Sequence, residues 1–248
     1  MPTKYMIPID VQYYQINRIY TITNLDTLNT QKRYSLFRSK NADRNTNFIF
    51  TDGSKNPRKQ AGAAIYNEQH GIQMKIKLPA DTSVFTAKVI TIRQALIEIK
   101  NKQITESIIC TDSMSALTAI IAPTIKINEN WYIANAKHLF YKLDKANIHI
   151  AWIPAHKQIK GNEMADKLAK EAAQEGDNKI HNITLPITDI LMTYKQQLKE
   201  SRDKEWEKNK NNNYSYLQPN VLYKPWFAER KYSRNITTLI IQPRTKIF

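Results

Sequence analysis

The sequence predicts an α/β fold built on one mixed β-sheet, and the spacing of its apolar residues is the main reason. Three apolar or alternating runs come first, and from residue 84 onward segments with helical spacing alternate with single apolar runs. Strands followed by an alternation of helices and strands are typical of a sheet covered by helices. In addition, two of the apolar runs end in an aspartate, at Asp52 and Asp112.

The first predicted strand, residues 48–54, reads Phe-Ile-Phe-Thr-Asp-Gly-Ser. A continuous apolar strand is usually buried on both faces, so we expect this one near the middle of the sheet. Residues 61–66 and 72–78 predict two more strands with a hairpin connection at 67–71, and Pro79 ends the second of them. Together they predict three antiparallel strands.

Helical spacing begins at residue 84 and predicts a helix to residue 102, in which Lys88 falls on the apolar face. The other residues of that face are Phe85, Ile92, Ala95, Leu96 and Ile99. The rest of the pattern predicts a strand at 108–113, a short helical piece up to Ile121, a helix at 132–143, a strand at 148–153 and a helix at 161–174.

The flanks differ in composition from this central part. Residues 1–47 are rich in Thr, Asn and Tyr without clear periodicity, which predicts a loosely structured leader before a folded domain at 48–177. Residues 178–248 predict a basic, aromatic-rich C-terminal extension that begins with a helix capped by Thr188. Its residues 214–234 mix aromatic and basic side chains, which suits either stacking on bases or packing as a small apolar appendage.

Charge and cysteine content indicate the kind of partner and the cellular compartment to expect. The net charge of +15 lies mostly in the flanks and mildly favours a nucleic acid partner, although many basic proteins bind no polyanion. The single cysteine, Cys110, lies in an apolar run and fits a reducing compartment. Because no membrane span or secretory signal is evident, we expect a soluble intracellular protein, either nuclear or cytoplasmic.

Asp52 and Asp112 are the first candidate site residues. If their strands run parallel in the centre of the sheet, the two carboxylates meet at the carboxyl ends, where α/β folds bind ligands. Two close carboxylates repel each other unless a cation or a proton intervenes. The alternative is that both are turn formers, since Asp-Gly and Asp-Ser are common turn sequences.

Four motifs in order carry a resemblance to a known family: Thr51-Asp52-Gly53-Ser54, Thr111-Asp112-Ser113, Trp152-Ile153-Pro154-Ala155-His156 and Gly161-Asn162-Glu163-Met164-Ala165-Asp166. Over residues 48–176 the chain resembles type 1 ribonuclease H, in particular the domain carried by non-LTR retrotransposon (reverse transcriptase) polyproteins of animals. In those polyproteins a polymerase domain lies upstream, outside the present sequence.

The resemblance implies a ribonuclease H-like fold, with a five-stranded sheet, a central first strand and helices on both faces. It also implies an endonuclease that hydrolyses the RNA strand of an RNA–DNA hybrid at a site where four carboxylates hold two Mg²⁺ ions, with Mn²⁺ as a substitute. The first, third and fourth carboxylates fall on Asp52, Asp112 and Asp166, and His156 falls on a histidine that assists proton transfer and product departure. The second carboxylate is replaced by Lys88.

Lys88 creates a second hypothesis about function. An ammonium in place of a carboxylate weakens cation binding, so the alternative is a catalytically dead domain that only binds nucleic acid. We expect Lys88 to serve as the counter-charge of the carboxylates, although its amine can also snorkel out to solvent. Asp166 can simply complement a helix N-terminus, and His156 can be a solvated loop residue.

Overall fold

The computed structural model describes residues 19–21, 27–41, 45–123, 129–175 and 183–208. The chain divides into two compact units, residues 1–190 and residues 191–248. The described residues of the second unit all belong to one helix, α6 (Ile187–Lys208), which begins in the first unit. The sheet and the candidate site lie in the first unit.

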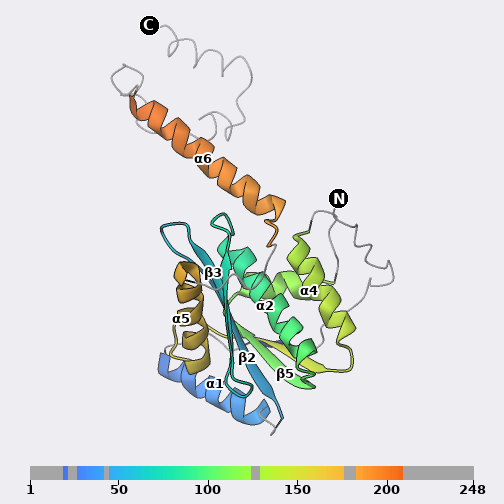
Figure 1. Ribbon diagram of the computed structural model, residues 1–248. Coiled ribbons are helices and arrows are strands. Elements are labelled where there is room, and N and C mark those ends of the chain that lie inside the picture. Colours follow the sequence, from blue (N-terminus) through green and yellow to red (C-terminus); the bar gives the residue numbers. More distant parts are fainter. Residues whose placement is uncertain (1–18, 22–26, 42–44, 124–128, 176–182, 209–248) are drawn as a thin grey trace, which may run out of the picture. The chain divides into compact units, whose positions relative to one another are not determined.

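The predicted five-stranded mixed sheet is confirmed (Figure 1). Its strands are β2 (Asn47–Lys55), β3 (Ala61–Asn67), β4 (Ile72–Leu78), β5 (Glu106–Thr111) and β6 (Asn147–Trp152). The first three pair antiparallel, and β5 and β6 continue the sheet in parallel from β2. A short sixth strand, β1 (Ile19–Thr21), pairs with β6 at the edge, so the order is β1-β6-β5-β2-β3-β4.

Helices cover both faces of the sheet (Figure 1). One face carries α2 (Val84–Asn101), α3 (Met114–Ile121) and α4 (Trp131–Lys142), and the other carries α1 (Thr27–Asn41) and α5 (Lys160–Glu175). Successive side chains of a strand point to opposite faces. Ile49 of β2 therefore packs in the core under α2, whereas Phe48 and Phe50 pack in the core under α1 and α5.

Helix α1 corrects the prediction that residues 1–47 are loosely structured. That prediction was wrong for residues 19–21, which form β1, and for 27–41, which form α1. Tyr34 and Phe37 of α1 pack on Phe50 and Phe48, with ring centroids 6.4 and 6.3 Å apart. Because α1 is mostly polar and touches the sheet along a narrow stripe, its sequence shows little helical periodicity. Residues 1–18 lie outside the described part.

The segment that precedes α6 also belongs to the first unit. The Tyr132 hydroxyl donates to the Thr184 carbonyl at 3.0 Å, and the buried Asp189 carboxylate accepts from the Ser83 amide and hydroxyl at 2.9 and 3.0 Å. The unit therefore continues to residue 190, past the predicted boundary at 177.

Helix α6 begins at Ile187, one residue before the predicted cap at Thr188. The Pro186 carbonyl accepts hydrogen bonds from the Asp189 and Ile190 amides at 3.0 and 3.2 Å, so Pro186 rather than Thr188 stands at the start of the helix. The apolar side chains of its predicted stripe are exposed; they are Ile190, Leu191, Tyr194 and Leu198. Residues 214–234 lie outside the described part, so the two interpretations of that segment stay predictions. Within the described ranges, no helix combines the length and the apolar character needed to cross a membrane.

Candidate active site

Asp52 and Asp112 lie next to each other where the parallel pairing of β2 and β5 ends, although β2 itself continues to Lys55 in its pairing with β3. Thr51 of β2 pairs with Thr111 of β5, and each aspartate is the next residue along its chain. Asp52 is only 5% exposed, and its Oδ1 accepts a 2.8 Å hydrogen bond from the Gly53 amide. The Trp152 indole donates to the Asp112 carbonyl at 3.0 Å, which fixes the turn after β5.

Lys88 lies between these two carboxylates. Its Nζ is 2.9 Å from Asp52 Oδ1 and 2.5 Å from Asp112 Oδ1. The ammonium therefore does not snorkel out to solvent, and that alternative was wrong. It forms the ion pairs that the sequence predicted for a counter-charge.

Gly53 makes this placement possible. A Cβ atom at residue 53 would lie 2.7 Å from Ala87 Cβ and 2.8 Å from the Lys88 amide nitrogen. Both distances are too short for a real side chain, so the glycine lets the start of α2 pack directly against β2. Ser83 caps α2 by accepting from the Thr86 amide at 3.1 Å, which fixes where the helix begins.

Burial raises the pKa of Asp52 to about 6, against the opposing effect of the Lys88 charge, and the nearby Asp112 carboxylate acts in the same direction as burial. Burial alone would lower the pKa of Lys88, but the two carboxylates outweigh it and bring the pKa above its ordinary value. At neutral pH the Lys88 ammonium therefore faces an ionised Asp52 carboxylate, and together with Asp112 these side chains form a group that we call the Lys88 triad.

This triad does not fit a divalent cation. Such an ion would have to lie about 2.0–2.6 Å from oxygens of both carboxylates. The Lys88 ammonium already makes contacts of 2.9 and 2.5 Å with those oxygens, and it would repel a second positive charge. In the conformation described, Asp52 and Asp112 are partners of an amine rather than ligands of a metal.

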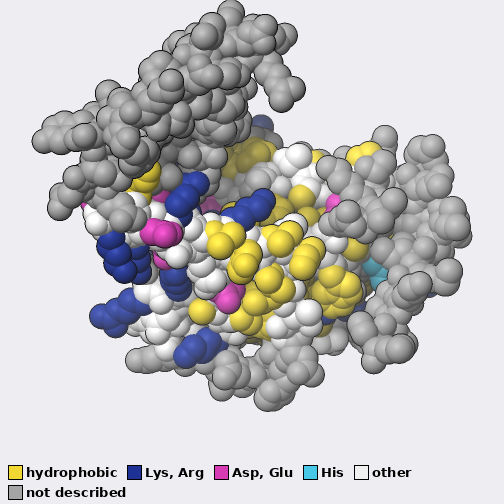
Figure 2. Space-filling view, turned by 90° about the horizontal axis from the view of Figure 1, so that it is seen from above, with side chains coloured by type: hydrophobic (Ala, Val, Ile, Leu, Met, Phe, Trp, Pro, Cys, Tyr) yellow, Lys and Arg dark blue, Asp and Glu magenta, His cyan; other side chains and the backbone are white. Residues whose placement is uncertain are grey.

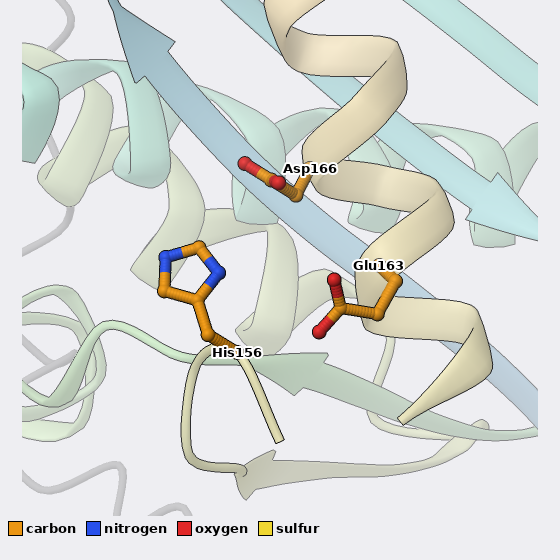
Figure 3. Close-up of side chains that lie close together, drawn as sticks. All are labelled: His156, Glu163 and Asp166. Atoms are coloured by element: carbon orange, nitrogen blue, oxygen red, sulfur yellow. The ribbon is translucent and has the colours of Figure 1, made fainter. Parts of the chain in front are cut away.

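Asp166 belongs to a different group, with His156 and Glu163 (Figure 3). Asp166 and Glu163 lie one turn apart on α5, and His156 projects toward them from the loop that precedes α5. One ligand atom from each residue lies within 4.8 Å of the others. Among the residues that the structure describes, no other three His, Cys, Asp or Glu side chains bring their ligand atoms this close together. Asp52 and Asp112 are not members of the group.

Glu163 was not among the candidate ligands predicted from the sequence. It lies in the quoted motif, but an acidic residue in the first turn of a helix is common for electrostatic reasons alone. The available signal was the three-residue spacing from Asp166, since residues three apart on a helix share one face. Other contacts in the group are a 2.6 Å ion pair from Lys170 to Asp166 and a 3.3 Å hydrogen bond from the Gln158 amide to Glu163.

Comparison with known proteins decides the family. The model of the family RNase H matches residues 44–174, more than half of the chain. The chain belongs to the RNase H family. Three proteins named ribonuclease H1 are similar to it: those of Mus musculus (30% identical over 145 residues), Rattus norvegicus (30% over 144) and Homo sapiens (28% over 145).

These alignments cover 52% of the present chain and 51%, 50% and 51% of the three relatives, so the chain spans about half the length of the curated relatives it matches. The RNase H match begins close to β2 and ends near the end of α5, in agreement with the ribonuclease H domain that the motifs predicted. Helix α1 and residues 183–190 lie outside the matched range, although they pack on the same unit. The RNase H family uses divalent metals, which makes the departure at Lys88 central to function.

Proposed function

We propose that this RNase H domain binds RNA–DNA hybrids and that the reaction of its active site is hydrolysis of the RNA strand. The single observation that carries the proposal is that Asp52 and Asp112 lie together where the parallel pairing of β2 and β5 ends, in a chain of the RNase H family. The similarity to three proteins named ribonuclease H1 supports it.

The proposed site residues divide into two groups. Asp52 and Asp112 form the buried carboxylate pair, and Asp166 with His156 forms the more accessible edge of the site on α5 and its preceding loop. His156 is exposed, which suits a residue that accepts or releases a proton as product leaves. Selection of RNA over DNA would depend on contacts to 2′-hydroxyl groups rather than on sequence.

The charge of the chain suits a polyanionic substrate. Figure 2 shows lysine and arginine side chains gathered on one part of the viewed face, beside a few acidic ones. With a net charge of +15, the chain attracts phosphate groups, and binding through such contacts weakens as salt increases. On the motifs quoted above we further propose an origin in a non-LTR retrotransposon polyprotein.

A second candidate function is favoured by the ion pairs of Lys88. Because the ammonium contacts both Asp52 and Asp112, the domain would bind hybrid and cleave it slowly or not at all. The two candidates share a substrate and differ in the rate of hydrolysis. Replacing Lys88 by glutamate restores the carboxylate that the family motif has at this position.

The test compares the natural chain with Lys88→Glu on a hybrid whose RNA strand is labelled, with Mg²⁺ and with Mn²⁺. We expect both proteins to bind hybrid, little or no cleavage by the natural chain, and cleavage by Lys88→Glu. The matched control is Lys142→Glu, which makes the same charge change at an exposed position of α4 and should behave like the natural chain.

Equal cleavage by the natural chain and by Lys88→Glu would show that Lys88 does not limit the reaction. Competition with unlabelled duplex DNA tests the substrate: bound hybrid that resists the competitor, but is released as salt rises, supports the proposal. If neither protein prefers hybrid over duplex DNA, the proposed function is wrong.

A further inference from the structure

We propose that this chain holds one divalent cation rather than two, and that His156, Glu163 and Asp166 bind it. The inference rests on the proposed function, because a bound ion takes part in hydrolysis only if the chain acts on RNA–DNA hybrids. Ion binding itself can be measured without hybrid. Three features carry the proposal. Lys88 excludes a metal from Asp52 and Asp112, the side chains on α5 and its preceding loop form a suitable set of donors, and the negative charge of those donors is only partly balanced by Lys170.

The carboxylates of Asp52 and Asp112 are closed to metal. Their Oδ1 atoms both contact the Lys88 ammonium, at 2.9 and 2.5 Å, and the three side chains are largely buried. A cation entering between them would have to displace the ammonium from both of its ion-pair partners, which is costly for a charge held away from water.

The donors on α5 and its preceding loop form a suitable set. Figure 3 shows the His156, Glu163 and Asp166 side chains turned toward a common space, which offers one nitrogen and two carboxylate donors. Their ligand atoms lie within 4.8 Å of one another. Ligands at about 2.0–2.2 Å from one ion lie at most about 4.4 Å apart, so a shift of a few tenths of an ångström among the three side chains is enough to bring them around one ion.

The charge around these donors also favours a cation. Glu163 and Asp166 are two carboxylates on one face of α5, and Lys170 pairs with Asp166 through Oδ2 at 2.6 Å. In the ranges that the structure describes, Glu163 forms no ion pair; it accepts only the Gln158 amide. A second cation is therefore favoured next to Glu163, since close carboxylates repel each other without one.

The donor set predicts which ion binds best. Imidazole nitrogen is a good ligand for transition metals, whereas Mg²⁺ prefers oxygen ligands and gives up its waters reluctantly. We therefore expect Mn²⁺ to bind more tightly than Mg²⁺. This preference separates the His156, Glu163 and Asp166 group from a site made of carboxylates alone.

The test is titration of the full chain with Mn²⁺, followed by electron paramagnetic resonance of the free ion. We expect one bound ion in the natural chain, and affinity at least about tenfold lower in His156→Ala and in Glu163→Gln. The matched control is Glu171→Gln, the same substitution two turns further along α5 at a residue that pairs with Lys75, and it should bind like the natural chain.

Two more variants test the inference because they should increase Mn²⁺ binding rather than weaken it. Lys170→Met frees the Asp166 carboxylate and should tighten Mn²⁺ binding about two- to fivefold, which a damaged fold would not do. Lys88→Glu should add a second ion while Glu163→Gln still removes the first.

No saturable binding, or equal binding by the natural chain and Glu163→Gln, would overturn the inference. Its failure is distinct from that of the proposed function. A chain that binds hybrid but no Mn²⁺ refutes only the metal site, whereas one that binds Mn²⁺ through Glu163 but no hybrid supports the metal site and refutes the substrate.

Discussion

At the scale of single residues, Lys88 determines the chemistry of the candidate site. The same long side chain that could have left its amine in solvent is held between Asp52 and Asp112 because α2 begins directly against β2. An ion pair of this kind is weak evidence for net stabilisation, but removing one partner leaves buried charge without compensation. The stability of the chain should therefore respond strongly to changes in this triad.

The first prediction is that Lys88→Met lowers the free energy of unfolding at pH 7 by about 2–4 kcal/mol, because two buried carboxylates lose their counter-charge. Urea denaturation measures the change. Lys170→Met is the control, since that lysine makes an ion pair of similar length at an exposed position and should cost less than about 1 kcal/mol. Equal losses in the two variants would contradict the expected role of Lys88.

The second prediction concerns pH. The pKa of Asp52 is raised by burial from 3.8 to about 6, so the folded chain binds this proton more tightly than the unfolded chain. The contribution to stability is therefore fully present below about pH 4 and is lost as the pH rises through about 6. Asparagine does not titrate, so the Asp52→Asn variant should lose less free energy of unfolding between pH 4 and pH 7 than the natural chain, by on the order of 2 kcal/mol. Denaturation curves at the two pH values test it, and an unchanged difference would count against it.

At the scale of elements, the contact between α2 and β2 is the decisive packing interaction of the site. It requires a residue without a side chain at position 53, and it brings Lys88 of the helix to Asp52 of the strand. The same helix start is also held by Asp189, which accepts two hydrogen bonds from the cap residue Ser83. The first turn of α2 is thus fixed by two independent sets of contacts.

The third prediction is that Gly53→Ala destabilises the fold by about 2 kcal/mol or more, since its Cβ would lie 2.7 Å from Ala87 Cβ and would push α2 away. Gly71→Ala is the control: its Cβ meets nothing within 4 Å, so only the left-handed backbone, φ 61°, opposes it, at about 1 kcal/mol. Thermal or urea unfolding of both variants gives the comparison, and a smaller loss at residue 53 than at residue 71 would refute the packing interpretation.

At the scale of the whole molecule, the first unit is larger than the range that matches the RNase H family. Helix α1 places Tyr34 in the core with Phe50, and residues 183–190 bond to α2 and α4. The matched range of 44–174 contains neither segment. The sequence-based boundaries at 48 and 177 therefore leave out buried contacts, although they enclose the candidate catalytic residues.

The fourth prediction is that a fragment of residues 19–190 is more stable than one of residues 48–177. Loss of the buried Tyr34 and of the Asp189 hydrogen bonds should lower the free energy of unfolding by at least about 2 kcal/mol. Urea denaturation of the two fragments measures this, and limited proteolysis of the full chain should spare residues 27–41. Equal stability of the two fragments would mean that the folded domain ends at residues 48 and 177, as the sequence predicted.

From residue 47 onward, the sequence by itself determined the order of strands and helices, the helical faces and the motifs that lead to the RNase H family, because apolar spacing and turn residues act locally. It also placed Lys88 on the inward face of its helix. It did not predict β1 or α1, whose residues show little periodicity. Only the tertiary structure decided that Lys88 contacts both Asp52 and Asp112, and that Asp166 groups with Glu163 and His156 instead. Those groupings depend on how closely α2 and α5 approach the sheet, which is set by packing between residues far apart in the chain and has no signature in local periodicity.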